Sequence, residues 1–173
     1  MAVFFLVRPL KILAKRTIID GNKVVAAHAD FLTADAVAGT RLQFSLAKDS
    51  IVEFKVEGSG GSAAGTGVDL DLVIDGVFQA TNQRIVAGVV TPATPAVGFP
   101  DHGMKTFSAD ANFAAAFNLS WLVDNLGEGV HSFVLYAKAS TAAGQINAAK
   151  ATNALVITVI EHADTYPPSA SAP

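Results

Sequence analysis

The chain has 173 residues, of which 51% are hydrophobic and 16% are charged, with no cysteine and a formal net charge of −3. The apolar content excludes a disordered chain, and the small negative charge provides no basic stripe for nucleic acid. The lack of cysteine excludes disulfides, thiol catalysis and thiolate metal sites. Much of the apolar content is small or β-branched, with 31 Ala and 19 Val. Because charged residues are scarce for the surface of a lone domain, we expect other subunits to cover part of it.

An apolar run opens the chain at Val3, Phe4, Phe5 and Leu6. Its positive charges follow the run, whereas a secretory signal places them before it. The run is too short for a membrane helix, and Pro9 follows it closely. It is either a β-strand, which Val and Phe favour, or an apolar arm that docks on a neighbouring subunit.

Turn residues and alternating patterns predict the first strands. Gly21-Asn22 lies between two apolar stretches, 17–20 and 23–26, and predicts an early hairpin. Residues 41–46 and 51–57 alternate apolar and polar side chains, which is typical of half-buried strands, with a turn at 48–50 between them.

A glycine-rich stretch at 58–67 has the composition of a flexible loop and lacks the Gly-Lys-Ser/Thr of a nucleotide loop. Residues 68–74 predict a strand, Asp75-Gly76 its turn, and 77–80 the next strand.

A long loop is expected at 88–103, because its prolines exclude a sheet interior. Long loops in compact domains often serve a function, so this one is the best candidate for an interaction loop. The candidate interface comprises the apolar run, this loop and the Pro/Ser/Ala tail at 163–173. Its residues are Val3, Phe4, Phe5, Leu6, Pro92, Pro95, Phe99, Pro100 and Tyr166.

The clearest pattern spans 117–138, where two alternating stretches flank turn residues at 125–129. It predicts a long antiparallel pair of strands. Residues 155–161 are apolar on both faces and predict a central or covered strand. The expected core residues are Leu119, Trp121, Phe133, Leu135, Ile157 and Val159.

No pattern selects a catalytic, cofactor or metal site. Asp69, Asp71 and Asp75 lack the ligand spacing of a calcium loop and predict a solvated strand face. His28, His102, His131 and His162 lack the close spacing of a helical zinc site, although a folded sheet could bring two together.

Hydrolase and sugar-binding chemistry have weaker signals. Asp101-His102 is an adjacent acid–imidazole pair, but neighbouring residues rarely point at each other, and no nucleophile elbow is present. Trp121, the single tryptophan, could stack on a sugar, but it shares its predicted face with Phe117 and Leu119, which favours core packing. We therefore expect a non-enzymatic protein without a cofactor.

Regularly spaced turn signals and short alternating stretches predict an all-β antiparallel β-sandwich or jelly roll, with an N-terminal arm and a long Pro/Gly loop. The expected units are an arm and hairpin at 1–30, a sandwich at 31–162 and a tail at 163–173.

Three segments, 70–76, 121–135 and 155–161, resemble a pattern in jelly-roll virion proteins of tailed bacteriophages. The resemblance implies a structural subunit of the virion, commonly trimeric, that decorates or cements a capsid or forms part of a fibre or tail. The expected partners are then further copies of the chain, as a homotrimer, and a major capsid protein, with no nucleic acid and no membrane. The alternative is a carbohydrate-binding module of a tail, fibre or surface assembly.

Overall fold

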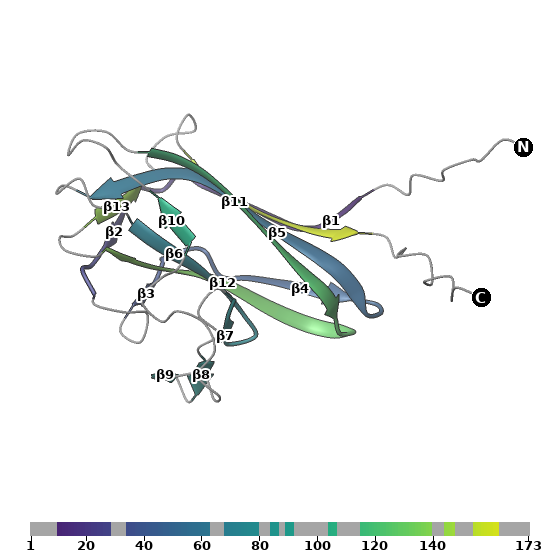
Figure 1. Ribbon diagram of the computed structural model, residues 1–173. Helices are drawn as coiled ribbons and strands as arrows, with labels where there is room; N and C mark the ends of the chain where they lie inside the picture. The colour runs from purple at the N-terminus through teal and green to yellow at the C-terminus, as the bar shows by residue number, and fades with distance from the viewer. Residues whose placement is uncertain are drawn as a thin grey trace, which may run out of the picture.

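The computed structural model describes residues 10–28, 34–62, 68–79, 84–86, 89–91, 104–106, 115–139, 144–147 and 154–162. The regular elements in these residues are all β-strands, and they form two antiparallel sheets (Figure 1). The first sheet contains β1 (Lys11–Ile18), β2 (Lys23–Val25), β5 (Ser50–Ser62), β11 (Ala115–Leu126), β13 (Gly144–Asn147) and β14 (Leu155–His162). The second contains β3 (Asp35–Ala36), β4 (Leu42–Leu46), β6 (Val68–Ile74), β7 (Val77–Phe78), β8 (Arg84–Val86), β9 (Val89–Thr91), β10 (Met104–Thr106) and β12 (Gly129–Ala139).

Several of these strands are consecutive pieces of one longer strand. β1 pairs with β14 and β2 pairs with β13, while β13 and β14 lie end to end along the same side of β5. In the second sheet, β3 and β4 likewise lie along one side of β12. Gly21-Asn22 therefore interrupts a composite strand, and the early hairpin predicted there is wrong. Residues 11–25 belong to the sandwich itself.

The pairing is nested from the two ends of the chain inward. β1 and β2 pair with β14 and β13, β3 and β4 pair with β12, β5 pairs with β11, and β6 pairs with β7 and β10. Successive partners alternate between the sheets, which is the wrapping of a jelly roll. The predicted fold class, an antiparallel β-sandwich of jelly-roll type, is confirmed.

The strand pairing also corrects the prediction that residues 117–138 form an antiparallel pair of strands. β11 and β12 follow each other around the turn at 127–128, but β11 pairs with β5, whereas β12 pairs with β4 and β6. The turn chemistry at 125–129 thus carries the chain from one sheet to the other and does not close a two-stranded hairpin (Figure 1). The Asp75-Gly76 turn does close a hairpin, between β6 and β7, as predicted.

Glycines of the predicted flexible loop extend β5 instead, so that the loop prediction is wrong for 58–62. A Cβ on Gly60 would lie 2.8 Å from the Gln145 carbonyl oxygen, and one on Gly58 would lie 2.9 Å from Cζ of Phe117. Glycine is needed there because neighbouring strands approach closely. The loop expected at 88–103 likewise contains strand β9, which pairs with β8, and it ends at β10.

The core fills the space between the two sheets. Phe54 of the first sheet lies 5.7 Å, between ring centroids, from both Phe44 and Phe133 of the second. Phe133, Leu135, Ile157 and Val159 have no exposed surface, while Leu119 and Trp121 are partly buried and pack against this cluster. Each of the six expected core residues therefore contacts the interior.

Candidate functional site

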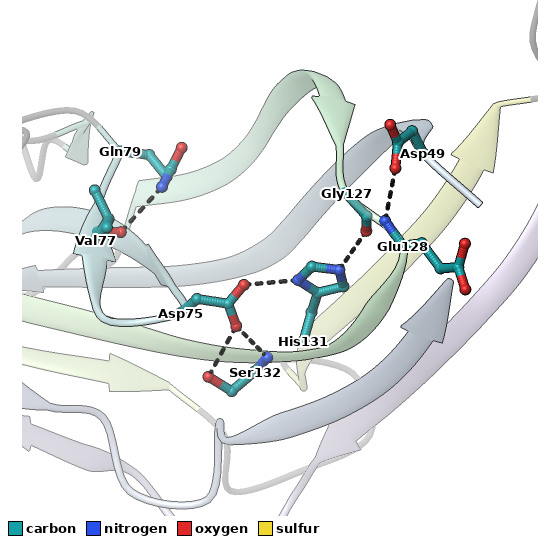
Figure 2. A network of polar contacts seen from close by, with 8 residues as sticks. All are labelled: Asp49, Asp75, Val77, Gln79, Gly127, Glu128, His131 and Ser132. Carbon is teal, nitrogen blue, oxygen red and sulfur yellow. Dashed lines mark hydrogen bonds and ion pairs between the residues drawn. The ribbon is translucent and has the colours of Figure 1, made fainter. Parts of the chain in front are cut away.

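Three turns meet at one end of the sandwich, where polar groups tie them together (Figure 2). They are the β4–β5 turn with Asp49, the β6–β7 turn with Asp75, and the β11–β12 turn with Gly127 and Glu128. Asp49 accepts the Glu128 backbone N–H at 2.8 Å. This hydrogen bond connects the β4–β5 turn with the β11–β12 turn, and each of these turns carries the chain from one sheet to the other.

His131 lies in the middle of this network, near the start of β12. Its Nδ1 lies 2.6 Å from Oδ2 of Asp75, and its Nε2 lies 2.7 Å from the carbonyl oxygen of Gly127. The ring is nearly buried and stacks on Phe44, with 5.5 Å between ring centroids. The other carboxylate oxygen of Asp75 accepts the Ser132 backbone N–H at 2.7 Å.

The backbone at these turns is shaped for the contacts. Asp75 has a φ of 48° and Gly76 a φ of 80°, as the two central residues of a mirror-image hairpin turn require. Asp tolerates this left-handed conformation because its short polar side chain can bond to nearby backbone. We call His131, Asp75, Ser132, Gly127, Glu128 and Asp49 the turn clamp.

The turn clamp is built to hold structure rather than to move protons in a reaction. A catalytic histidine needs one ring nitrogen free for a nucleophile, as in the serine hydrolase arrangement. Both nitrogens of His131 already face oxygen atoms, and the Ser132 hydroxyl lies on Asp75, at 3.4 Å, rather than on the ring. The arrangement fixes the relative positions of three turns.

A second polar cluster lies on the outer face of the first sheet. Glu53 accepts hydrogen bonds from the Ser120 hydroxyl at 2.6 Å and from the His162 ring at 2.9 Å, and Lys55 lies 3.4 Å away. Partial burial raises the pKa of Glu53, but the hydrogen bonds from Ser120, His162 and Lys55 outweigh it, so that the pKa lies below its ordinary value. This cluster connects β5 with two of the strands that pair with it, β11 and β14.

Glu161 makes a similar link at the end of β14. The Ser50 hydroxyl donates to it at 2.8 Å and Lys11 lies 3.1 Å away. The Ser50 hydrogen bond is the main cause that holds the pKa of Glu161 below its ordinary value, with Lys11 adding to it against partial burial.

A buried ion pair lies on the outer face of the second sheet. Nζ of Lys138 is 3.2 Å from Oδ2 of Asp69, and the two side chains are 3% and 5% exposed. Asp71 is completely buried nearby on the same strand as Asp69. The solvated strand face predicted for these two aspartates is therefore wrong, since every residue of β6 is buried, on both faces of the sheet.

The structure separates most of the other candidate residues. The backbone N–H of His28 donates to the Ala139 carbonyl oxygen, at the end of β12 opposite to His131. His162 lies on β14, in the first sheet. Among the described residues, no group of three or more His, Asp or Glu side chains could hold a metal ion. The nine interface candidates from Val3 to Tyr166, together with Asp101 and His102, lie outside the described residues.

Trp121 does not point to the outer surface. It pairs in register with Phe54, which is completely buried, and its side chain packs against the core. A sugar-stacking role for this residue therefore loses its structural basis.

Sequence reasoning missed the turn clamp because its members are far apart in the chain. His131 and Asp75 are separated by 56 positions, and only the fold brings their strands together. The available signals were a turn aspartate and a histidine on the core-facing side of an alternating strand.

Comparison of the sequence with protein-family models and with curated proteins found no match. Within the described part of the chain, no helix has the length and apolar character needed to cross a membrane.

Proposed function

We propose that the chain is a structural subunit of a virus particle, a capsid decoration protein that binds and stabilises the shell of major capsid protein. In this proposal it acts as a homotrimer, without an enzymatic reaction or a cofactor. The jelly-roll pairing is the observation that carries the proposal. This architecture recurs in viral capsid proteins, and the link to function is one of fold-level analogy.

The placement of the first and last strands supports an attachment role. Lys11 of β1 pairs in register with Glu161 of β14, so that Leu10 and His162, the first and last described residues, lie at one corner of the sandwich. We call Leu10, Ile12 and His162 the exit corner. Leu10 is 58% exposed and Ile12 is 60% exposed, so that two large apolar side chains at this corner are open to a partner.

The apolar residues Val3 to Leu6 precede the exit corner in the sequence, with Val7, Arg8 and Pro9 between them and Leu10. In this proposal, Val3 to Leu6 and the exposed Leu10 and Ile12 supply the apolar side chains that contact the partner. Apolar side chains packed in a complementary pocket contribute much of the binding energy at protein interfaces. The proposed contact with the capsid shell therefore forms at this corner, while the two packed sheets supply a rigid body.

The test measures binding of the purified chain to capsid shells. The shells are produced from the viral genome that encodes the chain, with the gene for the chain removed. We expect the full chain to sediment with the shells in a fixed ratio to the capsid protein. A variant lacking residues 1–9 should bind at least about tenfold more weakly, while one lacking residues 164–173 should retain more of the affinity. A full chain that stays in the supernatant would contradict the proposal.

Point variants separate the exit corner from exposed apolar surface in general. Leu10→Ser with Ile12→Ser should weaken shell binding, whereas Val24→Ser should not. Val24 is 81% exposed and lies on β2, at the opposite end of the same composite strand. Equal losses in the two variants would remove the exit corner from the proposal.

The carbohydrate-binding alternative receives no support from the described residues. Trp121, its main candidate, faces the core. A glycan array on the full chain still distinguishes the two functions, because specific binding at micromolar concentration would favour the alternative.

A further inference from the structure

The outer face of the second sheet holds an amine and a carboxylate in contact, with almost no exposed surface on either. Nζ of Lys138 lies 3.2 Å from Oδ2 of Asp69, and the two side chains are 3% and 5% exposed. The two residues are opposite each other in the register of β12 and β6, so that the strand pairing keeps both side chains on one face. We propose that this ion pair is the precursor of an intramolecular isopeptide bond, which joins Nζ of Lys138 to Cγ of Asp69 and ties β12 covalently to β6.

The side chains next to the pair are also covered. Along the same face, Tyr136 lies opposite Asp71, and Val134 lies opposite Val73. Asp71 has no exposed surface and Val73 is 1% exposed, while the Tyr136 ring packs against the edge of Phe78 with 4.9 Å between ring centroids. Because buried charges are costly, such a place favours a neutral amide over an ion pair. Exclusion of water also protects the amide from the reverse reaction.

The reaction balances within the pair. One proton of the Lys138 ammonium passes to the Asp69 carboxylate, and the nitrogen lone pair then attacks Cγ. The C–N bond forms, the bond from Cγ to one oxygen breaks, and this oxygen leaves as water with two hydrogens that came from the nitrogen. Groups that a structure holds in a productive orientation react as if present at about 10⁵–10⁸ M. Until the bond forms, the two side chains act as a buried ion pair.

Asp71 is placed to carry the second of these protons. It lies two positions from Asp69 on the same face of β6, which makes it the diagonal neighbour of Lys138 across the strand pair. Diagonal neighbours in an antiparallel pair are within reach of a long side chain. A carboxylate there accepts the proton from the attacking nitrogen as a general base and returns it to the leaving oxygen as a general acid.

Mass spectrometry of the full chain tests the proposal. Wild-type protein kept for a week in neutral buffer should be lighter by one water molecule than its sequence requires. Trypsin should then release residues 56–84 joined to residues 106–150, because it does not cleave after a lysine whose amine is bonded, as Lys138 would be. The joined peptide is the decisive reading, since a succinimide at Asp75-Gly76 would also remove one water but would leave the peptides separate.

Lys11 and Glu161 are the matched control within the same chain. Their charged atoms are 3.1 Å apart, but the Lys11 side chain is 65% exposed, so that water should keep this pair unbonded and trypsin should cleave after Lys11. Lys138→Arg should keep the mass that its sequence requires, because a guanidinium replaces the amine. Asp71→Asn should form the bond at least about tenfold more slowly, because an amide cannot carry the proton.

Separate peptides 56–84 and 106–138 from the wild type after the week would overturn the proposal. Bonding of Lys11 to the same extent as Lys138 would also overturn it, because burial would then not direct the reaction. An unchanged rate in Asp71→Asn would overturn the role of Asp71. The first two readings come from the wild type, so that they decide even if a variant does not fold.

Discussion

Lys138 and Asp69 face each other across β12 and β6 as a buried ion pair, with their charged atoms 3.2 Å apart and both side chains almost without exposed surface. Taking two charges out of water is costly, and their attraction offsets this cost only while both partners are present. The pair therefore matters less for total stability than for the penalty incurred when one member is lost.

Lys138→Met should lower the free energy of unfolding by about 3–5 kcal/mol, because it leaves the Asp69 carboxylate buried without this partner. The double variant, Lys138→Met with Asp69→Leu, should recover most of the loss. Urea unfolding of the wild type, the two single variants and the double variant measures this directly. A double variant as unstable as the sum of the singles would show that the two side chains do not act as a pair.

Gly60→Ala should destabilise the fold by about 1–3 kcal/mol, since the added methyl group would overlap with backbone that has little room to move. A Cβ at this position would lie 2.8 Å from the Gln145 carbonyl oxygen. Gly127→Ala is the control, because a Cβ on Gly127 would have a side-chain oxygen of Asp49 as its nearest neighbour, at 3.9 Å. In thermal unfolding, Gly60→Ala should lower the melting temperature and Gly127→Ala should not. Equal melting temperatures for the two variants would contradict the close approach of β13 to β5.

Trp121→Ala should cost about 3 kcal/mol of stability, because the side chain packs against the core. If Trp121 were instead a surface residue used for binding, its replacement by Ala would change the free energy of unfolding little. Chemical denaturation distinguishes these two cases. Stability unchanged by the substitution would reopen the sugar-binding interpretation.

Acid should destabilise the protein through Glu53 and Glu161. Both carboxyls have a pKa below the ordinary value of 4.5, so that their contribution to stability is present above that pH and is lost as the pH falls below it. Glu53→Gln should therefore show a shallower loss of stability between pH 5 and pH 3 than the wild type. Identical acid profiles for the two proteins would mean that Glu53 does not contribute through its charge.

Local patterns in the sequence were sufficient for the fold class and the core. Alternation placed Phe133, Leu135, Ile157 and Val159 on inward faces, because side chains on a strand point to opposite sides in turn. It was not sufficient for the strand partners. Turn residues at 125–129 indicate that the chain changes direction, but they carry no information on whether the next strand returns to the same sheet or crosses to the other.

The same limit explains the errors at β6 and β5. Asp69 and Asp71 alternate with apolar residues, as solvent-facing residues do, yet other parts of the chain cover this face and Lys138 pairs with one of them. Gly58 and Gly60 have a loop-like composition, but they serve the close approach of β11 and β13. Both cases depend on neighbours that are distant in sequence, as do His131 and Asp75 in the turn clamp.

The most direct test of the proposed function is cryo-electron microscopy of virus particles produced from the genome that encodes this chain. The proposal predicts density for the jelly roll on the outside of the capsid, in threefold clusters, with Leu10 and Ile12 of the exit corner turned toward the shell. Particles without this density, or with the opposite end of the sandwich against the shell, would contradict it.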